Sequence, residues 1–440
     1  MGDIVNKESD IYKQKKDFVD TLIKLYNYNF KQYQLIIFIK GEMMQLIKKL
    51  TFSILVFSLV TIIFADSVII ESKDGSAPIA ALINNAKSSV KLSIYQLITE
   101  PYPAPSTTVI PPTPSYFTRP VLNALVKANN KSDVKVEIIV GNFTANGWPA
   151  SGIVDWNYEN TWATTNSVSM VKSSIMFSND PTYDCYAHNK YMIIDDKKVV
   201  IMTGNLTTGS FVDTSEHKIR NFYVVVEDTA SVSYMKTLFA QDLKNSVNGT
   251  ATTPPNIPSN LLIGPNTANI TAIADFISNA ENKIDIYMMY FDNDCPAAIF
   301  SAIKNSDATI RILLSNLQKQ TVLTAQFPDA NTSDSNITYK IIPSSNPLFI
   351  HTKTFIRDGS SVLLGSMNMS ATSLNKNREV DMISSSTEVV SPIQTQFDTD
   401  WNSVSVQTQT SQPKKKKGYY PYYKHHYYDH KHYDDSGDDN

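Results

Sequence analysis

One motif occurs twice in this chain with the same spacing, and it constrains the fold more than any other feature. In each copy a lysine follows a histidine by two positions, an aspartate follows the lysine by five, and an asparagine follows the aspartate by ten. The two sets are His188, Lys190, Asp195 and Asn205, and His351, Lys353, Asp358 and Asn368. With Gly365 and Ser366, the second copy specifies six positions, and at average residue usage such a pattern arises by chance on the order of 10⁻⁸ times per starting position. A second copy in register therefore indicates a duplication.

The spacing within the motif suits the chemistry of a phosphate ester. Residues two apart lie on one face of a strand, so an imidazole and an ammonium group can reach the same phosphate. Lys190 and Lys353 would hold its non-bridging oxygens and stabilise the charge that develops on them. Further donors are expected from Thr203, Asn205, Ser366 and Asn368. One motif alone lacks a nucleophile and an acid together, whereas two motifs face to face supply both.

The segments around the motifs repeat as well. The expected elements are a helix at 76–86 and strands at 90–97 and 134–140, matched by a helix at 267–280 and strands at 284–291 and 310–314. Strands that alternate with helices predict an α/β sheet. A proline-rich segment at 250–260 suits neither a helix nor a central strand, so it predicts a linker. We therefore expect two domain-sized repeats, 66–249 and 261–404.

The pattern H-x-K-(x4)-D-(x6)-G-S-x-N, found twice in a duplicated α/β chain, resembles the phospholipase D superfamily over residues 67–404. The resemblance implies two tandem α/β/α sandwich repeats related by a pseudo-twofold axis, with the active site at their interface. The second motif matches in full. The first has Met202 where the family usually has Gly and Thr203 where it usually has Ser. Thr203 keeps the hydroxyl, whereas Met202 is expected to add bulk near the phosphate.

The resemblance also implies a two-step displacement that uses no metal or other cofactor. One histidine attacks phosphorus and forms a phosphohistidine, and the other protonates the leaving alcohol and then activates water. In the family an acidic residue beyond the Asn orients the histidine of the opposite half. Glu379 follows the second motif, but Asn221 takes the matching place after the first. We therefore expect His188 to be the nucleophile and His351 the general acid. The alternative is that Glu379 lies on the surface.

The remaining polar and aromatic residues of the body carry weaker signals. Asp195 and Asp358 belong to the catalytic motif, but we expect them to fix strand ends and the lysines rather than to transfer protons. His217 lies outside any motif and is expected to be solvated. An aromatic segment before the first motif could form an interfacial rim or could pack a long loop, and it contains Trp148, Trp156, Tyr158 and Trp162.

The N-terminal 65 residues carry a processing signal. After Met44, two lysines precede an apolar stretch at 50–64, and Ala65 offers a small-residue cleavage point. This pattern predicts a signal peptide at 44–65 and a secreted or lumenal protein, of the endosome or lysosome for example. The alternative is an uncleaved type II membrane anchor, with 1–43 as a cytoplasmic tail. Whether residues 1–43 belong to the mature protein stays open.

Other features bear on this export hypothesis. Glycosylation sequons in segments expected to be mostly loops are Asn130, Asn142, Asn248, Asn269, Asn331 and Asn336. Two more, Asn205 and Asn368, lie in the expected active site and should stay unmodified. Cys185 and Cys295 could form one bridge or could remain separate thiols. Residues 405–440, rich in Lys, Tyr and His, lack the periodicity of a packed core and predict a disordered tail.

Charge helps to rank the substrates. Residues 1–65 hold nine Lys and six Asp or Glu, so the rest of the chain has 30 basic and 36 acidic residues. A long nucleic acid favours clustered positive charge, so we do not expect one as a partner. We expect a phosphoric diester hydrolase that cleaves glycerophospholipids at a membrane surface. The alternatives are an exonuclease of single-stranded nucleic acid, a phosphatidyl transferase, and a degenerate binding protein without activity.

Overall fold

The structure is a computed structural model that describes part of the chain, as two compact units, Met1–Phe64 and Ala65–Asn440. The described residues are 16–24, 66–97, 119–141, 159–173, 187–207, 210–211, 218–248, 252–315, 320–343 and 345–405. In the first unit they form one exposed helix, at 16–24. The signal segment at 44–65 and the tail beyond 405 lie outside this set, as do Trp148, Trp156, Tyr158, Cys185 and His217.

The second unit contains a first half with five described helices and eight strands. They are β1 (Ser67–Ile70), α3 (Glu71–Asp74), α4 (Ala77–Asn84), β2 (Ser89–Ile94), α5 (Arg119–Asn129), β3 (Lys135–Val140), β4 (Ser169–Lys172), β5 (Lys190–Ile194), β6 (Lys198–Met202), β7 (Lys218–Arg220), β8 (Phe222–Val226) and α7 (Thr229–Asn248), together with a short helical segment that begins at 159.

The second half follows the same course after the linker. Its described elements are β9 (Leu261–Ile263), α8 (Ala268–Ser278), β10 (Lys283–Met288), α9 (Ala297–Lys304), β11 (Thr309–Leu314), α10 (Gln320–Gln326), β12 (Ile337–Ile341), β13 (Leu348–Ile350), β14 (Lys353–Arg357), β15 (Ser361–Gly365), α11 (Ala371–Asn375), β16 (Val380–Ser384) and α12 (Thr387–Ser403).

The two halves build the same sheet. The first sheet has the order β1-β8-β6-β5-β2-β3-β4, and the second, read from its other edge, has the order β9-β16-β15-β14-β10-β11-β12. In both, two parallel pairs stand on one side of an antiparallel set. The predicted α/β class and the two tandem repeats are thus confirmed. Lys190 and Lys353 open β5 and β14, the central strands of the two sheets.

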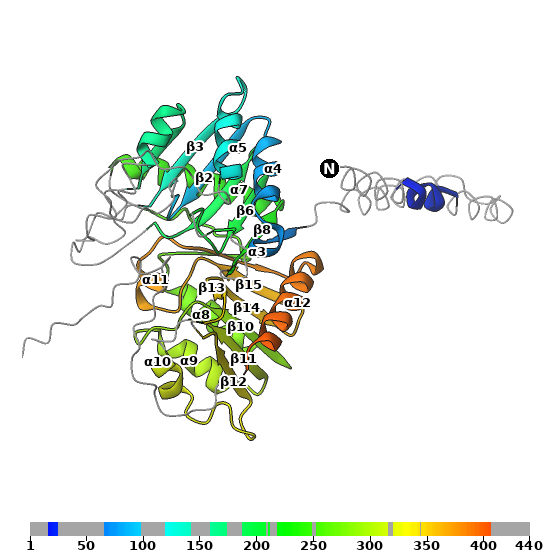
Figure 1. The fold of residues 1–440 in the computed structure, drawn as a ribbon, viewed down its shortest axis with the longest axis vertical. Helices are drawn as coiled ribbons and strands as arrows, with labels where there is room; N and C mark the ends of the chain where they lie inside the picture. The colour runs from blue at the N-terminus through cyan, green and yellow to red at the C-terminus, as the bar shows by residue number, and fades with distance from the viewer. Residues whose placement is uncertain are drawn as a thin grey trace, which may run out of the picture. The chain divides into compact units, whose positions relative to one another are not determined.

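Strand patterning explains why both faces of each sheet are covered. In β5, Tyr191 and Ile193 face one hydrophobic core while Met192 and Ile194 face another. Each half has its own outer core. That of the first half contains residues of α4 and α5, and that of the second half contains residues of α8, α9 and α10. The inner core takes residues from both sheets and from α7 and α12. Figure 1 shows α4 and α5 beside the first sheet and α12 beside the second. The shared inner core makes the two halves one body.

Most of the predicted elements are present with small changes in their bounds. The strand expected at 90–97 ends at Ile94, because the chain then leaves the sheet and pairs Leu97 with Leu206 beside the motif. The second half repeats this departure, with Phe291 paired to Met369. No helix among the described residues is long and apolar enough to cross a membrane.

Two of the predicted glycosylation acceptors are not in loops. Asn269 is buried within α8, and Asn248 is the last residue of α7. Asn336 lies in a bend before β12, as expected, and its side chain donates hydrogen bonds to the carbonyls of Ser306 and Ala308. The expectation of a loop is therefore wrong for Asn269 and Asn248. Cys295 is a free, buried thiol, and Cys185 lies outside the described residues.

Candidate active site

Two reciprocal crossings between the halves bring the motifs together. The chain before His351 forms β13, which pairs in parallel with β7 of the first half. The amide of His351 donates to the carbonyl of Arg220 at 3.2 Å. In the mirror arrangement, the amide of His188 donates to the carbonyl of Arg378 at 2.9 Å. Each motif histidine is therefore anchored by the backbone of the other half.

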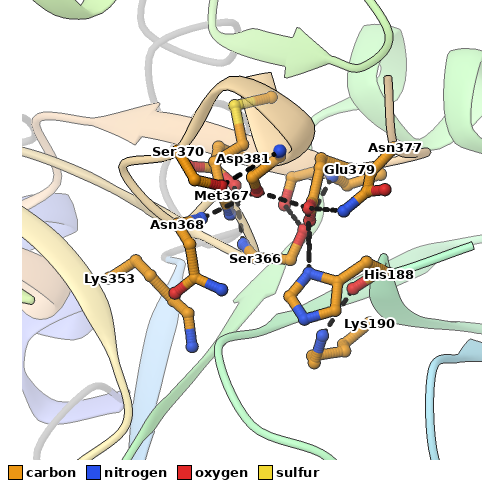
Figure 2. Close-up of polar contacts among 12 residues, drawn as sticks. His188, Lys190, Lys353, Ser366, Met367, Asn368, Ser370, Asn377, Glu379 and Asp381 are labelled. Carbon is orange, nitrogen blue, oxygen red and sulfur yellow. Dashed lines mark hydrogen bonds and ion pairs between the residues drawn. The ribbon is translucent and has the colours of Figure 1, made fainter. Parts of the chain in front are cut away.

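The crossing places Glu379 directly behind His188. The Nδ1 atom of His188 lies 2.9 Å and 2.8 Å from the two carboxylate oxygens of Glu379. Figure 2 shows this pair, with the contact from Asn377 to Glu379 beside it. Glu379 is fully buried and also accepts hydrogen bonds from Ser373 and Asn377. The predicted contact across the halves is present, and Glu379 is not a surface residue.

The charge state of His188 follows from burial and its neighbours. Burial lowers the pKa of His188 to about 4, although Glu379 raises it, and Lys190 and Lys353 lower it further. Glu379 thus makes the imidazole more basic, as expected, but burial outweighs that effect. Burial also acts on Glu379, yet the contact with His188 holds the pKa of Glu379 below its usual value. A neutral imidazole that donates Nδ1–H to a carboxylate leaves the Nε2 lone pair available for attack.

His351 has an amide in the corresponding place. Its Nδ1 atom lies 2.9 Å from Oδ1 of Asn221, and that oxygen also accepts a hydrogen bond from the Thr203 hydroxyl at 3.0 Å. Burial, followed by the charges of Lys353, Lys190 and His188, lowers the pKa of His351 well below its usual value. Among the described residues no carboxylate contacts this ring directly, so the two histidines sit in electrostatically different surroundings.

The two motif lysines reach the same buried region from opposite halves. Figure 2 shows Lys190 beside His188, and Lys353 with Asn368 from the second half. Burial lowers the pKa of Lys190 to about 7 against the pull of Glu379 and Asp381, and burial and Lys190 lower that of Lys353. A bound phosphate would favour the charged form of both lysines. The arrangement can therefore hold one phosphate between two histidines.

Aromatic and thioether groups flank these lysines asymmetrically. The ring of Tyr95 meets His188 edge-on at 4.7 Å between centroids, and the Lys190 ammonium lies 5.1 Å from the Tyr95 ring centre. In the second half the Lys353 ammonium lies 3.7 Å from the sulfur of Met289. Tyr95 and Met289 each follow the strand next to the motif strand, which is a position that the motif alone does not mark.

The motif asparagines and the motif hydroxyls differ in their hydrogen bonding. Asn205 and Asn368 are nearly buried, and each has a carbonyl oxygen without a hydrogen-bond partner in the described residues. The Thr203 hydroxyl instead bonds Asn221 and accepts from the Phe222 amide, and Ser366 accepts from the Val380 amide. Both hydroxyls are thus hydrogen-bonded to the adjoining strand or its orienting residue, and their donation to a phosphate stays a prediction.

The expected bulk of Met202 near the phosphate stays a prediction. Met202 is fully buried in the outer core of the first half, and its strand register places its side chain on the same face of the sheet as Lys190. Gly365 holds the matching place in β15, where an added Cβ would lie 2.2 Å from Oδ1 of Asp381. Because Tyr223 replaces Asp381 in the first half, a side chain fits there. The paired residues Met202 and Tyr223 thus correspond to Gly365 and Asp381 of the second half.

Asp195 and Asp358 lie at the far ends of the motif strands. Asp195 accepts hydrogen bonds from the amides of residues 87–89, and Asp358 accepts from those of 281–283. Despite some burial, these amides lower the pKa of both carboxyl groups. The expected fixing of strand ends is observed. Neither residue contacts its lysine, whose ammonium donates instead to the carbonyl of the motif histidine.

Two buried acids complete the site and were missed by the sequence reasoning. Asp381 accepts from the amides of Ser366 and Met367, and burial together with Glu379 raises its pKa to about 7. Glu71, from the first strand-to-helix turn, is likewise buried with a pKa raised by burial to about 7. Asp381 carries a weak signal, two residues after Glu379, whereas Glu71 is far from both motifs. No cluster of three metal-ligating side chains occurs among the described residues.

The comparisons with known proteins agree with this geometry. The sequence model of the family described as "Cardiolipin synthase, PLD-like domain" matches residues 79–243 and 273–401, more than half of the chain. The chain belongs to the phospholipase D superfamily. This assignment confirms the resemblance drawn from the two motifs.

Solved structures share the fold at low sequence identity. Phosphatidylserine synthase from Haemophilus influenzae Rd KW20 is 12% identical with a TM-score of 0.56, over 78% of this chain and 87% of that one. Polyphosphate kinase from Porphyromonas gingivalis is 13% identical with a TM-score of 0.50, over 77% and 47%. NucT from Helicobacter pylori is 20% identical over 41% and 95%, but its TM-score is 0.28. A search of curated proteins finds no match.

Proposed function

We propose that this protein is a phospholipase D-type phosphodiesterase that hydrolyses glycerophospholipids through a phosphohistidine. Phosphatidylcholine, for example, would yield phosphatidic acid and the free head group. The observation that carries the proposal is the reciprocal support of the two histidines. Nδ1 of His188 contacts Glu379 and Nδ1 of His351 contacts Asn221, each across the halves, which leaves both Nε2 atoms available for chemistry.

In the first step, Nε2 of His188 attacks phosphorus while the bond from phosphorus to the head-group oxygen breaks. His351, which must be protonated for this step, donates its Nε2 proton to that oxygen, so the head group leaves as an alcohol. Lys190 and Lys353 bind the non-bridging oxygens and stabilise the negative charge in the transition state. Glu379 accepts the hydrogen bond from Nδ1–H of His188 and stabilises the positive charge that the ring gains.

In the second step, His351 is neutral and acts as a base. It takes a proton from water, and the hydroxide oxygen bonds to phosphorus as the bond to Nε2 of His188 breaks. The product is the phosphatidic acid anion, and both histidines return to their starting states. General acid–base catalysis of this kind contributes on the order of 10²- to 10⁴-fold.

Several observations favour a lipid over a nucleic acid. The chain beyond residue 65 is more acidic than basic, which opposes a long polyanion. The matching family is described by a lipid synthase, and the structural neighbour with the higher TM-score is a phosphatidylserine synthase. The predicted signal peptide would place the enzyme in a secreted or lumenal compartment, where it would meet phospholipid at a membrane surface.

The same two names also favour phosphatidyl transfer as a second candidate. A transferase and a hydrolase share the first step and differ only in whether an alcohol or water attacks the phosphohistidine. Adding an alcohol acceptor to the assay distinguishes them. A transferase forms the new diester at the expense of phosphatidic acid, whereas a strict hydrolase does not.

The test is a comparison of substrates with purified protein in the presence of a chelator. Phosphatidylcholine vesicles and a 5′-hydroxyl oligonucleotide are incubated separately, and reactions are quenched in acid to trap the phospho-enzyme. We expect choline release and a labile phosphohistidine. Nucleotide release alone would select a nuclease instead, and activity on neither substrate would indicate a degenerate binding protein.

A further inference from the structure

Glu71 is a buried carboxyl group that the two motifs do not explain. It is fully buried at the start of α3 and belongs to neither copy of the motif. Its Oε1 accepts from the Phe211 amide at 2.6 Å and its Oε2 accepts from the Tyr223 hydroxyl at 2.7 Å. Because burying a carboxyl group is unfavourable, such groups often mark functional positions. Glu71 lies beside Asn221, the residue that contacts His351, and this position suggests its function.

Glu71 lies behind Asn221, on the side opposite His351. A Cβ placed on Gly204 would lie 2.5 Å from Nδ2 of Asn221 and 2.9 Å from Oε2 of Glu71. The Asn221 amide and the Glu71 carboxyl group therefore both lie beside Gly204. Within the described residues the Asn221 Nδ2 group has no partner at full hydrogen-bonding distance. The other end of the same amide, Oδ1, contacts His351 at 2.9 Å. The amide therefore stands between a carboxyl group and the ring.

We propose that Glu71 is the positioning carboxylate of His351 and acts on it through the amide of Asn221. A carboxylate that attracts the Nδ2 hydrogens polarises the amide and makes Oδ1 a stronger acceptor for Nδ1–H of His351. The ring is then held in one orientation, and its protonated form is stabilised. Glu71 thus supports His351 indirectly, through Asn221, whereas Glu379 supports His188 by direct contact. The proposal rests on the proposed function, since it concerns the general acid of that reaction.

The charges around the two groups set the sign of the effect. Burial raises the pKa of Glu71 to about 7, opposed by the Phe211 amide, Tyr223, Asn221 and Arg220. His351 faces the positive groups of Lys353, Lys190 and His188, which act with burial to lower its pKa. A negative Glu71 opposes these charges and raises the pKa of His351. Neutralising Glu71 should therefore lower the pKa of His351 and weaken the acid at neutral and alkaline pH.

Kinetics with two leaving groups test this role. p-Nitrophenolate is a good leaving group and departs with little proton donation from His351. An alkyl head group is a poor leaving group and depends on that proton. Glu71→Gln should slow alkyl release about tenfold, equivalent to one pKa unit, and nitrophenyl release less than about twofold. Asn221→Asp places a carboxylate in direct contact with His351. Adding Glu71→Gln to Asn221→Asp should therefore change the rates of alkyl and nitrophenyl release by less than about twofold. Equal slowing of both substrates, or an undiminished effect in the double variant, would overturn the proposal.

A matched control separates chemistry from stability. Asp285 is a fully buried carboxyl group paired with Arg311, outside the site. Asp285→Asn should lower the stability without changing the ratio of alkyl to nitrophenyl rates. If it changes that ratio as much as Glu71→Gln does, the ratio reports loss of packing and the proposal fails.

A titration that needs no substrate separates this proposal from the proposed function. The ring of His351 is followed by nitrogen-15 NMR, and Glu71→Gln should lower its pKa by about one unit. If the wild-type protein cleaves no diester, the proposed function fails but the titration still decides the role of Glu71. If Glu71→Gln does not fold, Tyr223→Phe removes one hydrogen bond from Glu71 and should shift the pKa of His351 in the same direction. An unchanged pKa in the folded variant would overturn the proposal.

Discussion

The two halves share their backbone geometry and differ in the charges behind the histidines. His188 has the carboxylate of Glu379 against Nδ1, whereas His351 has the amide of Asn221. The anchoring hydrogen bonds from the histidine amides to Arg378 and Arg220 are retained in both. Duplication therefore kept the positions of the two rings while their electrostatics diverged. That divergence suits a reaction in which one ring attacks and the other transfers a proton.

The arginines that anchor the histidines also exchange ion pairs between the halves. Arg220 of the first half binds Asp400 on α12, and Arg378 of the second half binds Asp242 on α7. Both pairs are buried. Each arginine thus holds a helix of the other half with its side chain and a histidine of the other half with its carbonyl group. The orientation of each ring depends on the docking of both halves.

The largest expected difference between the halves is the fate of the phospho-enzyme after loss of each histidine. His188→Ala should abolish the trapped intermediate and lower turnover at least about 10⁴-fold, because no nucleophile remains. His351→Ala should lose alkyl head-group release but still form intermediate from a p-nitrophenyl diester. Acid-quench labelling measures the amount of trapped intermediate in both variants. Label retained in His188→Ala but lost in His351→Ala would reverse the assignment of roles.

The next effect comes from making the two orienting residues alike. Glu379→Gln gives His188 an amide partner like that of His351, and we expect kcat to fall about 10³-fold because the ring loses the charge that stabilises its cationic intermediate. The measurement is kcat for a p-nitrophenyl diester, in which the acid matters little. As a control, Asn221→Asp should not lower that rate by more than about threefold. Equal losses in both variants would mean that the halves do not have separate roles.

The exchanged ion pairs should contribute unequally to stability. Asp400 accepts two N–H groups of Arg220 and the hydroxyl of Tyr287, whereas Asp242 accepts one N–H group of Arg378. Asp400→Asn should therefore cost about 3 kcal/mol or more, and Asp242→Asn less, since each leaves a buried cation without its charged partner. Urea denaturation measures both. The more solvent-accessible pair of Lys198 and Glu227 is the control, because Glu227→Gln should cost less than about 1 kcal/mol. A larger loss in Asp242→Asn would contradict the ranking.

The sequence was sufficient for the parts of the site that follow a regular spacing. The repeated motif follows from spacing and strand periodicity, and the contact from Glu379 to His188 follows from the resemblance to the family. The direction of side chains at strand ends does not. Met202 and Thr203 stand next to the motif, yet one side chain enters the outer core and the other bonds the adjoining strand. Spacing gives no sign of this, because it depends on which residue the neighbouring strand supplies.

Contacts between distant segments were beyond the sequence for a different reason. Glu71 reaches the site from the first strand because β1 pairs with β8 at the sheet edge, in an order that a single sequence does not reveal. Nothing near Glu71 resembles the motif, and an isolated glutamate is usually exposed. Its role depends on burial by the folded chain. The part of the site that distinguishes the two histidines is thus the part that needed the structure.

The smallest expected difference between the halves is at Asp195 and Asp358. Each carboxylate accepts three consecutive backbone amides at the turn before the parallel strands, and each aspartate has a positive φ, 55° and 53°. Because these contacts match, Asp195→Asn and Asp358→Asn should each cost about 1 to 2 kcal/mol. Their pKa values are lowered, so the stability that they provide is present at neutral pH and is lost as the pH falls below about 4.

Thermal or urea unfolding at pH 7 and pH 3 measures both aspartate variants, and the gap between each variant and the wild-type protein should narrow at the lower pH. Both variants should keep turnover within about threefold of the wild-type rate at a temperature where they are folded, since the carboxylates lie at the ends of β5 and β14 opposite the lysines. A loss of turnover in one half alone, with stability unchanged, would show that its aspartate takes part in the chemistry. The matched turns would then have diverged in function, as the orienting residues did.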